Sequence, residues 1–145
     1  FRFVLPGYNL RPLEMSGAIG CIQIQKFPNF LVQRKINAEI FLVKMENYDD
    51  IIIQKEIGSS SWFGFSIVIK PGSKRNRDNL VKTLNDIGFE CRPIVAGNFV
   101  KNNVVNYFNY EVEDNLENAN WIDENGLFIG NHHVGMKDAL NLLKL

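Results

Sequence analysis

The spacing of apolar residues along the chain predicts two helices in its N-terminal third. Apolar side chains recur at positions 15, 18, 19 and 22, which is the three- and four-residue spacing of one helical face. Pro12 suits the first turn of this helix, where no backbone N–H is needed. Residues 26–28 (KFP) interrupt the pattern, so we expect a second helix to begin at Pro28 and to continue to about Glu46.

Short apolar runs and polar breaks then alternate, which predicts strands and helices in turn. We expect strands at residues 51–57, 62–69, 89–95 and 127–130, and we expect the aromatic residues of the second strand to lie in the core. Helices are expected at residues 75–87, 116–125 and 136–145, with Gly88 as the C-cap of the first. The pattern predicts an α+β (α/β layer) fold with a small mixed sheet packed with helices. We expect one domain over residues 1–145, made of a helical segment (1–46) and a small mixed α/β part (47–145).

Length, charge and cysteine content narrow the class of protein. A chain of 145 residues fits one compact domain, and 16 basic against 16 acidic residues gives no reason to expect a nucleic-acid or anionic-membrane partner. No apolar run approaches the roughly 18 residues of a membrane span. Cys21 and Cys91 do not form a disulfide framework, so we expect two buried thiols in a reducing cytoplasm. Residues 1–5 look like the last strand of a preceding part, so we expect a fragment of a larger protein.

The turn before the first helix is a candidate anion site. Residues 8–11 (YNLR) lead into a helix N-terminus, which offers free N–H groups and the positive end of the helix dipole. Arg11 adds a planar guanidinium that can grip a phosphate or a carboxylate. The alternative is an ordinary turn in which Asn9 caps the helix and Arg11 lies on the surface, and the residue pattern leaves both open.

Two further places carry candidate chemistry. Arg92 lies inside an apolar strand and needs a partner if it is buried, although an edge-strand arginine in solvent is an equal alternative. Gly97 allows a close backbone approach, and Asn98 can both donate and accept a hydrogen bond at the strand end. His132 and His133 are adjacent, so on a strand they would point to opposite faces and could not share one metal ion. We therefore expect no metal site there, and a structural or substrate-edge role for the histidines.

Several motifs together resemble one protein family. Residues 7–12 (GYNLRP), Glu14 and residues 16–20 (SGAIG) resemble a signature of the DegT/DnrJ/EryC1/StrS sugar aminotransferases, which are fold-type-I enzymes dependent on pyridoxal 5′-phosphate (PLP). Residues 29–41, 61–65 (SWFGF) and 90–93 (ECRP) are similar to further segments of that family, with Cys91 in place of its usual threonine. The resemblance covers nearly the whole chain and implies the smaller C-terminal domain of a longer enzyme.

The resemblance also implies roles for individual residues. It implies that Asn9 reaches across a dimer to the cofactor phosphate and that Arg11 lies near the cofactor and substrate anions. It places Arg92 at the substrate mouth. Nothing in the chain resembles the lysine that bonds the cofactor, so we expect no catalytic residue here and an inactive isolated chain. The expected substrate-binding residues are Tyr8, Arg92, Asn98 and His132.

The implied function is that of a cytoplasmic, homodimeric enzyme of polysaccharide biosynthesis acting on a nucleotide-linked 4-keto-6-deoxyhexose. The reaction is either transamination or 3-dehydration, and residues 96–98 (AGN) look more like the 3-dehydratase branch. The residue that separates the two reactions, Lys or His at the cofactor-bonding position, is not in this sequence. The alternative is a non-catalytic module that binds a nucleotide, a sugar or a partner through the same anion-friendly turn.

Overall fold

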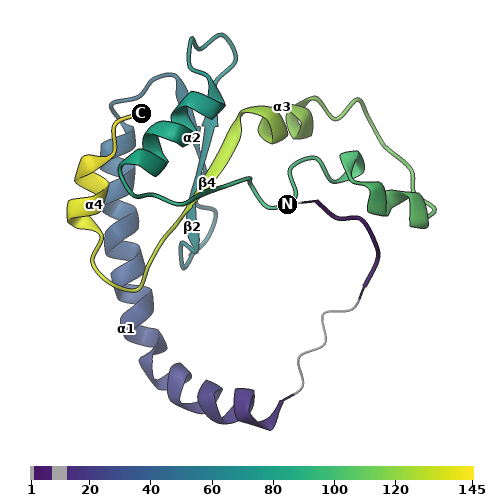
Figure 1. The fold of residues 1–145 in the computed structure, drawn as a ribbon. Helices are drawn as coiled ribbons and strands as arrows, with labels where there is room; N and C mark the ends of the chain where they lie inside the picture. Colours follow the sequence, from purple (N-terminus) through teal and green to yellow (C-terminus); the bar gives the residue numbers. More distant parts are fainter. Residues whose placement is uncertain (1, 8–12) are drawn as a thin grey trace.

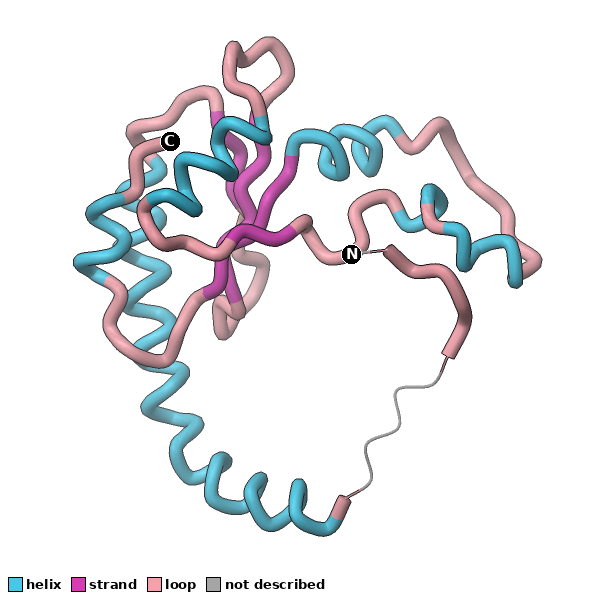
Figure 2. Tube along the Cα trace, in the orientation of Figure 1, coloured by secondary structure: helices cyan, strands magenta, loops and turns pink. Residues whose placement is uncertain are grey.

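Among the described residues, the fold consists of a four-stranded sheet, one long helix, three short helices and two 3₁₀ turns (Figures 1 and 2). A computed structural model describes residues 2–7 and 13–145. The strands lie in the order β1-β2-β4-β3. They are β1 (Ile51–Ile53), β2 (Gly64–Ile69), β3 (Cys91–Arg92) and β4 (Gly126–Gly130). The helical elements are α1 (Glu14–Met45), α2 (Arg77–Asp86), α3 (Glu117–Asn125), α4 (Lys137–Leu142), η1 (Phe99–Lys101) and η2 (Asn103–Tyr107).

The α+β class is confirmed, but the sheet is antiparallel at every described pairing rather than mixed. The reason lies in the position of β4. Strands β2 and β3 run in the same direction and are joined through α2, as in a parallel crossover unit. However, β4 inserts between them and runs antiparallel to both, so no two parallel strands pair.

The two expected N-terminal helices are one continuous helix, α1, with Pro28 inside it. A proline removes one helical hydrogen bond and crowds the preceding turn, which can bend a helix without ending it. Figure 1 shows α1 changing direction in its first half. Only the C-terminal half of α1 carries buried residues, namely Asn37, Ala38, Phe41 and Met45.

Two of the expected strands pair over less than half of the predicted length. The run at 51–57 pairs only over β1 (Ile51–Ile53), because Gln54 turns its side-chain amide to the β2 backbone, donating to the Gly64 carbonyl and accepting from the Ser66 N–H. The run at 89–95 pairs only over β3 (Cys91–Arg92), because Pro93 has no N–H to continue the ladder.

The core lies where α1, α2 and α4 cover the sheet. Phe41 of α1 stacks on Phe65 of β2, with ring centroids 4.2 Å apart and planes 12° apart, and both side chains are fully buried. Leu84 of α2 and Leu140 of α4 close the same cluster. β2 is buried along almost its whole length, which explains why its sequence is a continuous apolar run.

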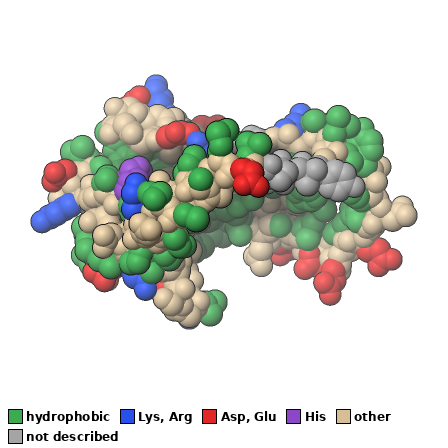
Figure 3. Space-filling view, turned by 90° about the horizontal axis from the view of Figure 1, so that it is seen from below, with side chains coloured by type: hydrophobic (Ala, Val, Ile, Leu, Met, Phe, Trp, Pro, Cys, Tyr) green, Lys and Arg blue, Asp and Glu red, His purple; other side chains and the backbone are tan. Residues whose placement is uncertain are grey.

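The first half of α1 presents apolar side chains to the surface. Residues 14–29 are exposed throughout, and the large apolar side chains among them are Met15, Ile19, Ile22, Ile24 and Phe27. Figure 3 shows hydrophobic side chains gathered on the face of the molecule that is seen from below. Within the described ranges, no helix combines the length and the apolar character needed to cross a membrane.

The expectation of two buried thiols is wrong for Cys21, which is exposed because it lies in this outlying part of α1. Cys91 on β3 is half-buried, and burial raises the pKa of its thiol because a thiolate there would lose hydration. The two cysteines therefore differ in accessibility, although both are unpaired.

Residues 2–5 form no strand, but their backbone is anchored. The Phe3 N–H donates to Asn102 Oδ1 (3.1 Å), and the Val104 N–H donates to the Phe3 carbonyl (3.1 Å). The Phe3 and Phe99 rings lie 5.6 Å apart. The start of the chain therefore packs on η1 and η2, close to the end of the sheet that carries β3 (Figure 1).

An ion pair joins Asp50, just before β1, to Arg75, just before α2. We expect it to make the stability of the fold depend on pH in the acid range. Asp50 Oδ2 accepts from Arg75 Nε (2.6 Å) and from Ser73 Oγ (2.8 Å), and these hydrogen bonds lower the pKa of Asp50. A depressed carboxyl pKa in the folded state contributes stability above the unfolded pKa, and this stability is lost as the pH falls through the folded value. We expect Asp50→Asn to lower the unfolding midpoint near neutrality and to flatten its acid dependence.

The measurement is thermal unfolding between about pH 2 and pH 6, the range in which a carboxyl with a lowered pKa titrates. The neighbouring, exposed Asp49 supplies the matched control, Asp49→Asn. If the unfolding midpoint of Asp50→Asn falls with pH as steeply as that of the unsubstituted chain, the prediction is contradicted.

Candidate functional site

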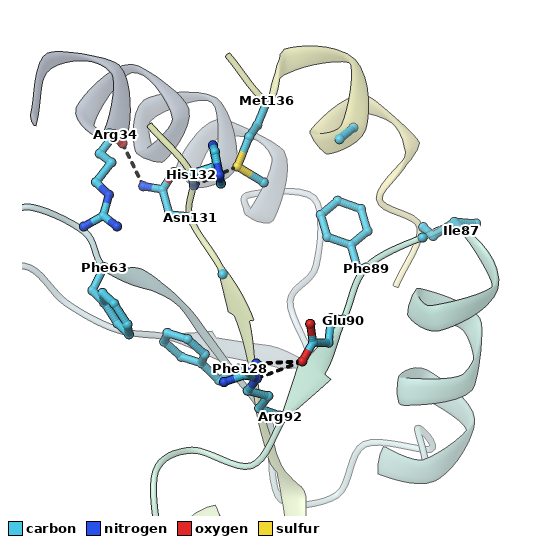
Figure 4. A pocket seen from close by; sticks show the side chains of 13 residues that line it. Arg34, Phe63, Ile87, Phe89, Glu90, Arg92, Phe128, Asn131, His132 and Met136 are labelled. Carbon is cyan, nitrogen blue, oxygen red and sulfur yellow. Dashed lines mark hydrogen bonds and ion pairs between the residues drawn. The ribbon is translucent and has the colours of Figure 1, made fainter. Parts of the chain in front are cut away.

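A cavity of about 420 Å³ opens between α1, β3 with the residues that precede it, and the loop that follows β4 (Figure 4). Four chain segments far apart in sequence meet here. The lining residues are Arg34, Phe63, Ile87, Gly88, Phe89, Glu90, Arg92, Phe128, Gly130, Asn131, His132, Met136 and Ala139.

A pair of stacked aromatic rings forms one wall of the cavity. The Phe63 and Phe128 rings lie 5.9 Å apart and are nearly parallel. Phe63 is 72% exposed, whereas the adjacent Trp62 is buried. The backbone causes this difference, because Trp62 has a positive φ of 48° and turns the chain just before β2. Gly64 makes room for the pair, since any side chain there would collide with the Phe128 ring.

Two arginines flank the aromatic pair. The Arg34 guanidinium lies over the Phe63 ring, 5.6 Å from its centroid, and Arg92 reaches the cavity beside Phe128 (Figure 4). The β3–β4 register explains the second contact, because Arg92 pairs directly with Phe128. A cation over an aromatic face is attracted to the electron-rich ring. The arrangement suits a planar ligand that carries negative charge.

Arg92 already has an internal partner, which answers the question left open by its place in an apolar strand. Its Nε (3.0 Å) and Nη2 (2.8 Å) both donate to Oε1 of Glu90. The Arg92 side chain is also 55% exposed, so the pair is screened by solvent and adds little stability. Arg92 therefore combines the two alternatives, a carboxylate partner and an open face toward the cavity.

His132 lines the cavity from the loop after β4 and is exposed. Strand β4 ends at Gly130, so the expectation that the two histidines point to opposite faces of a strand does not apply. Their rings instead stack 4.3 Å apart, and Phe30 of α1 packs on His133 at the same distance. Across residues 2–7 and 13–145, no cluster of three or more His, Cys, Asp or Glu side chains is placed to hold a metal ion.

Asn98 does not line this cavity. It is buried, its Oδ1 caps η1 by accepting from the Val100 N–H (3.2 Å), and its Nδ2 donates to Asn120 Oδ1 (2.9 Å). The structure thus brings Arg92 and His132 together and uses Asn98 to hold η1 against α3, so substrate contact by Asn98 stays a prediction. Three other predicted site residues lie outside the described part of the chain: Tyr8, Asn9 and Arg11.

Two of the residues that build the site were not predicted from the sequence. Arg34 was given no role, and Phe63 was expected in the core with its aromatic neighbours. Strand alternation gave no signal for Phe63, because it would place this residue on the same face as the buried Phe65. No signal in the sequence brings Arg34 to the same ring, because the contact depends on how α1 crosses the sheet.

The lining residues do not fit covalent attachment of PLP. That attachment requires an amine, and none of the thirteen lining residues is a lysine. Two guanidinium groups beside an exposed aromatic surface fit the phosphates and base of a nucleotide instead.

Comparison with known proteins agrees with this geometry. The chain belongs to the DegT/DnrJ/EryC1/StrS aminotransferase family, whose model matches residues 2–140. It is 53% identical to a GDP-4-keto-6-deoxy-D-mannose 3-dehydratase of Escherichia coli O55:H7, over 99% of this chain and 37% of that protein. It is 49% identical to a protein of the same name from Yersinia pseudotuberculosis, over 99% of this chain and 38% of that protein.

Solved structures show the same relationship. The E. coli GDP-4-keto-6-deoxy-D-mannose 3-dehydratase with bound hydrated PLP superposes with a TM-score of 0.87 at 54% identity, over 97% of this chain and 36% of that one. A mutant GDP-4-keto-6-deoxymannose 3-dehydratase with bound GDP-perosamine gives the same TM-score and identity, over 97% and 37% of the two chains. The chain therefore spans a little more than a third of the length of these relatives.

Proposed function

We propose that this chain forms the C-terminal domain of a PLP-dependent 3-dehydratase that acts on GDP-4-keto-6-deoxy-D-mannose in polysaccharide biosynthesis. The observation that carries the proposal is the 53% identity over 99% of the chain to a protein with that name. The choice of 3-dehydration over transamination rests on the same observation.

The cavity supports a nucleotide-linked substrate. GDP combines a flat purine with a diphosphate, and stacking on an aromatic side chain is a common way of binding a base. Phe63 offers exposed aromatic surface, while Arg34 and Arg92 bring planar guanidinium donors that match phosphate oxygens. In this proposal the cavity binds the nucleotide end of the substrate, with His132 at its edge.

We propose that the residue that bonds the cofactor lies outside this chain. When bound, PLP supplies an electron sink for bond breaking next to a carbon that carries nitrogen. Nothing among the lining residues can bond the cofactor, so this chain contributes substrate binding. From the family resemblance we assign Asn9 to the cofactor phosphate and Arg11 to the cofactor nearby, and we assign Tyr8 and Asn98 to the substrate.

We also propose a cytoplasmic homodimer. The apolar residues exposed along the first half of α1 support an association surface, since surface patches of this kind mark protein contacts. Two unpaired thiols, one of them exposed, agree with a reducing compartment. Light scattering of the protein at its full natural length tests the dimer, and a monomer at high concentration would contradict it.

The test of function is an assay of the protein at its full natural length with PLP, glutamate and GDP-4-keto-6-deoxy-D-mannose, followed by mass spectrometry. A 3-dehydratase yields a keto sugar that has lost the 3-hydroxyl oxygen. A transaminase yields a sugar in which the 4-keto oxygen is replaced by an amine. Binding of GDP without turnover of the sugar would instead support the non-catalytic binding module.

A further inference from the structure

Two buried asparagine side chains join the segments that line one end of the cavity. Asn37 of α1 is fully buried, and Asn131, directly after β4, is 5% exposed. The Asn37 Nδ2 lies within hydrogen-bond distance of three oxygens: Asn131 Oδ1 (3.0 Å), the His132 carbonyl (3.0 Å) and the Val134 carbonyl (2.9 Å). The Asn37 amide therefore ties α1 to the loop that carries His132.

The acceptor side of Asn37 is used as well. Its Oδ1 accepts from Gln33 Nε2 (3.1 Å) and from the Met136 N–H (3.0 Å). Met136 in turn contacts the cavity, and its Sδ accepts from the His132 N–H at 3.2 Å. One amide thus holds both ends of the loop that contains His132.

Asn131 extends the network to the two residues of the cation–aromatic contact. Its Nδ2 donates to the Arg34 carbonyl (2.9 Å) and to the Trp62 carbonyl (2.8 Å), and its N–H donates to the Phe63 carbonyl (3.3 Å). Figure 4 shows Asn131 between the α1 backbone at Arg34 and the loop that carries His132. The two asparagines therefore connect the backbones that bear Arg34, Phe63 and His132.

We propose that Asn37 and Asn131 are positioning residues of the nucleotide site, which set the distance between Arg34, Phe63 and His132. The inference rests on the proposed function, because it assigns these three side chains to the nucleotide. The asparagines act through the backbone of His132, Arg34 and Phe63, which line the cavity.

The bonding pattern argues for a positioning role beyond packing. Arg34 lies inside α1, where its carbonyl already takes part in the helical ladder, so the helix does not need the extra donor from Asn131. A buried amide is costly unless all its groups are paired, and a hydrocarbon side chain would fill the same space without that demand. Among the described residues, no buried side-chain nitrogen or oxygen is left without a partner. The amides are therefore fully used in holding three segments in one arrangement.

The test compares Asn37→Asp and Asn131→Asp in the protein at its full natural length. Each change keeps the shape of the side chain but replaces the donating NH₂ by an oxygen, which then faces carbonyl oxygens. We expect the Kd for GDP and the KM for the GDP-sugar to rise roughly tenfold or more, with kcat changed by less than about threefold, because the displaced groups bind the nucleotide. Isothermal titration calorimetry gives the Kd, and steady-state kinetics separates KM from kcat.

Ile51→Ala is the control for a purely structural effect. Ile51 is buried on β1, at the opposite edge of the sheet from β3, and removing its side chain lowers stability without touching the amides. At a comparable loss of Tm, we expect this variant to keep its affinity for GDP within about twofold, as distant sites usually act independently.

If the Asn37→Asp and Asn131→Asp proteins do not fold, Gln33→Met provides a milder variant. It removes one donor to Asn37 from a half-buried position, and we expect a rise in Kd of about threefold. Unchanged affinity in the folded variants, or an equal loss in Ile51→Ala, would overturn the positioning role. Failure of the unsubstituted protein to bind GDP would overturn the proposed function itself.

Discussion

Replacing Arg92 with methionine is expected to weaken binding of GDP by roughly 10- to 150-fold, the equivalent of about 1.5–3 kcal/mol for hydrogen bonds to a charged group. The substitution removes the guanidinium that flanks Phe128 at the cavity. It also leaves the Glu90 carboxylate without this partner beside the proposed phosphate position, and the like charge adds to the loss. Calorimetric titration of the full-length protein with GDP measures the effect.

Two variants control for charge and shape. Lys82→Met removes one positive charge from the exposed surface of α2, and we expect it to leave GDP affinity unchanged. Arg92→Lys keeps the charge but loses the planar fork, and we expect an intermediate affinity. An Arg92→Met protein that binds GDP as tightly as Lys82→Met would remove Arg92 from the site.

Replacing Phe41 with alanine is expected to destabilise the 145-residue chain by about 3–5 kcal/mol, the usual cost of truncating a buried phenylalanine. Phe41 is fully buried and stacks on Phe65, so its removal leaves a cavity between α1 and β2 and also breaks an aromatic contact. A loss of this size is a large fraction of the stability of a small domain. Equilibrium unfolding in urea, followed by circular dichroism, measures the change in unfolding free energy.

Val43→Ala is the matched control on the same helix. Val43 is exposed, and alanine favours the helix more than valine does, so we expect a neutral or slightly stabilising change of about 0.5 kcal/mol. If the two variants unfold at the same urea concentration, the Phe41–Phe65 contact is not the centre of the core.

The apolar pattern was most informative for elements that bury either one face or their whole surface. The helix near residue 80 and the strand near residue 66 lie close to where they were expected, because α2 shows one apolar stripe and β2 is buried along its length. The pattern failed at Pro28, because a proline inside a helix removes one hydrogen bond and can bend the helix without ending it. The division at residue 46 into a helical and an α/β part stays a prediction, although the core joins Phe41 of α1 to the sheet.

The site was predictable in part. Arg92 was singled out as a charge in an apolar strand and His132 as one of two adjacent histidines, and the structure places both at one cavity. Arg34 and the two asparagines of the positioning network were not expected there, because their importance depends on partners about 30 to 100 residues away.

The sequence by itself determined the α+β class, most of the short elements and, through its motifs, the family. These follow from local periodicity and from residue types in a fixed order, which do not depend on how elements pack. Only the tertiary structure decided that β4 lies between β2 and β3, that α1 is continuous, and that Arg34 meets Phe63. The physical reason is that contacts between distant segments depend on burial and hydrogen bonding across the whole fold, which a local pattern does not record.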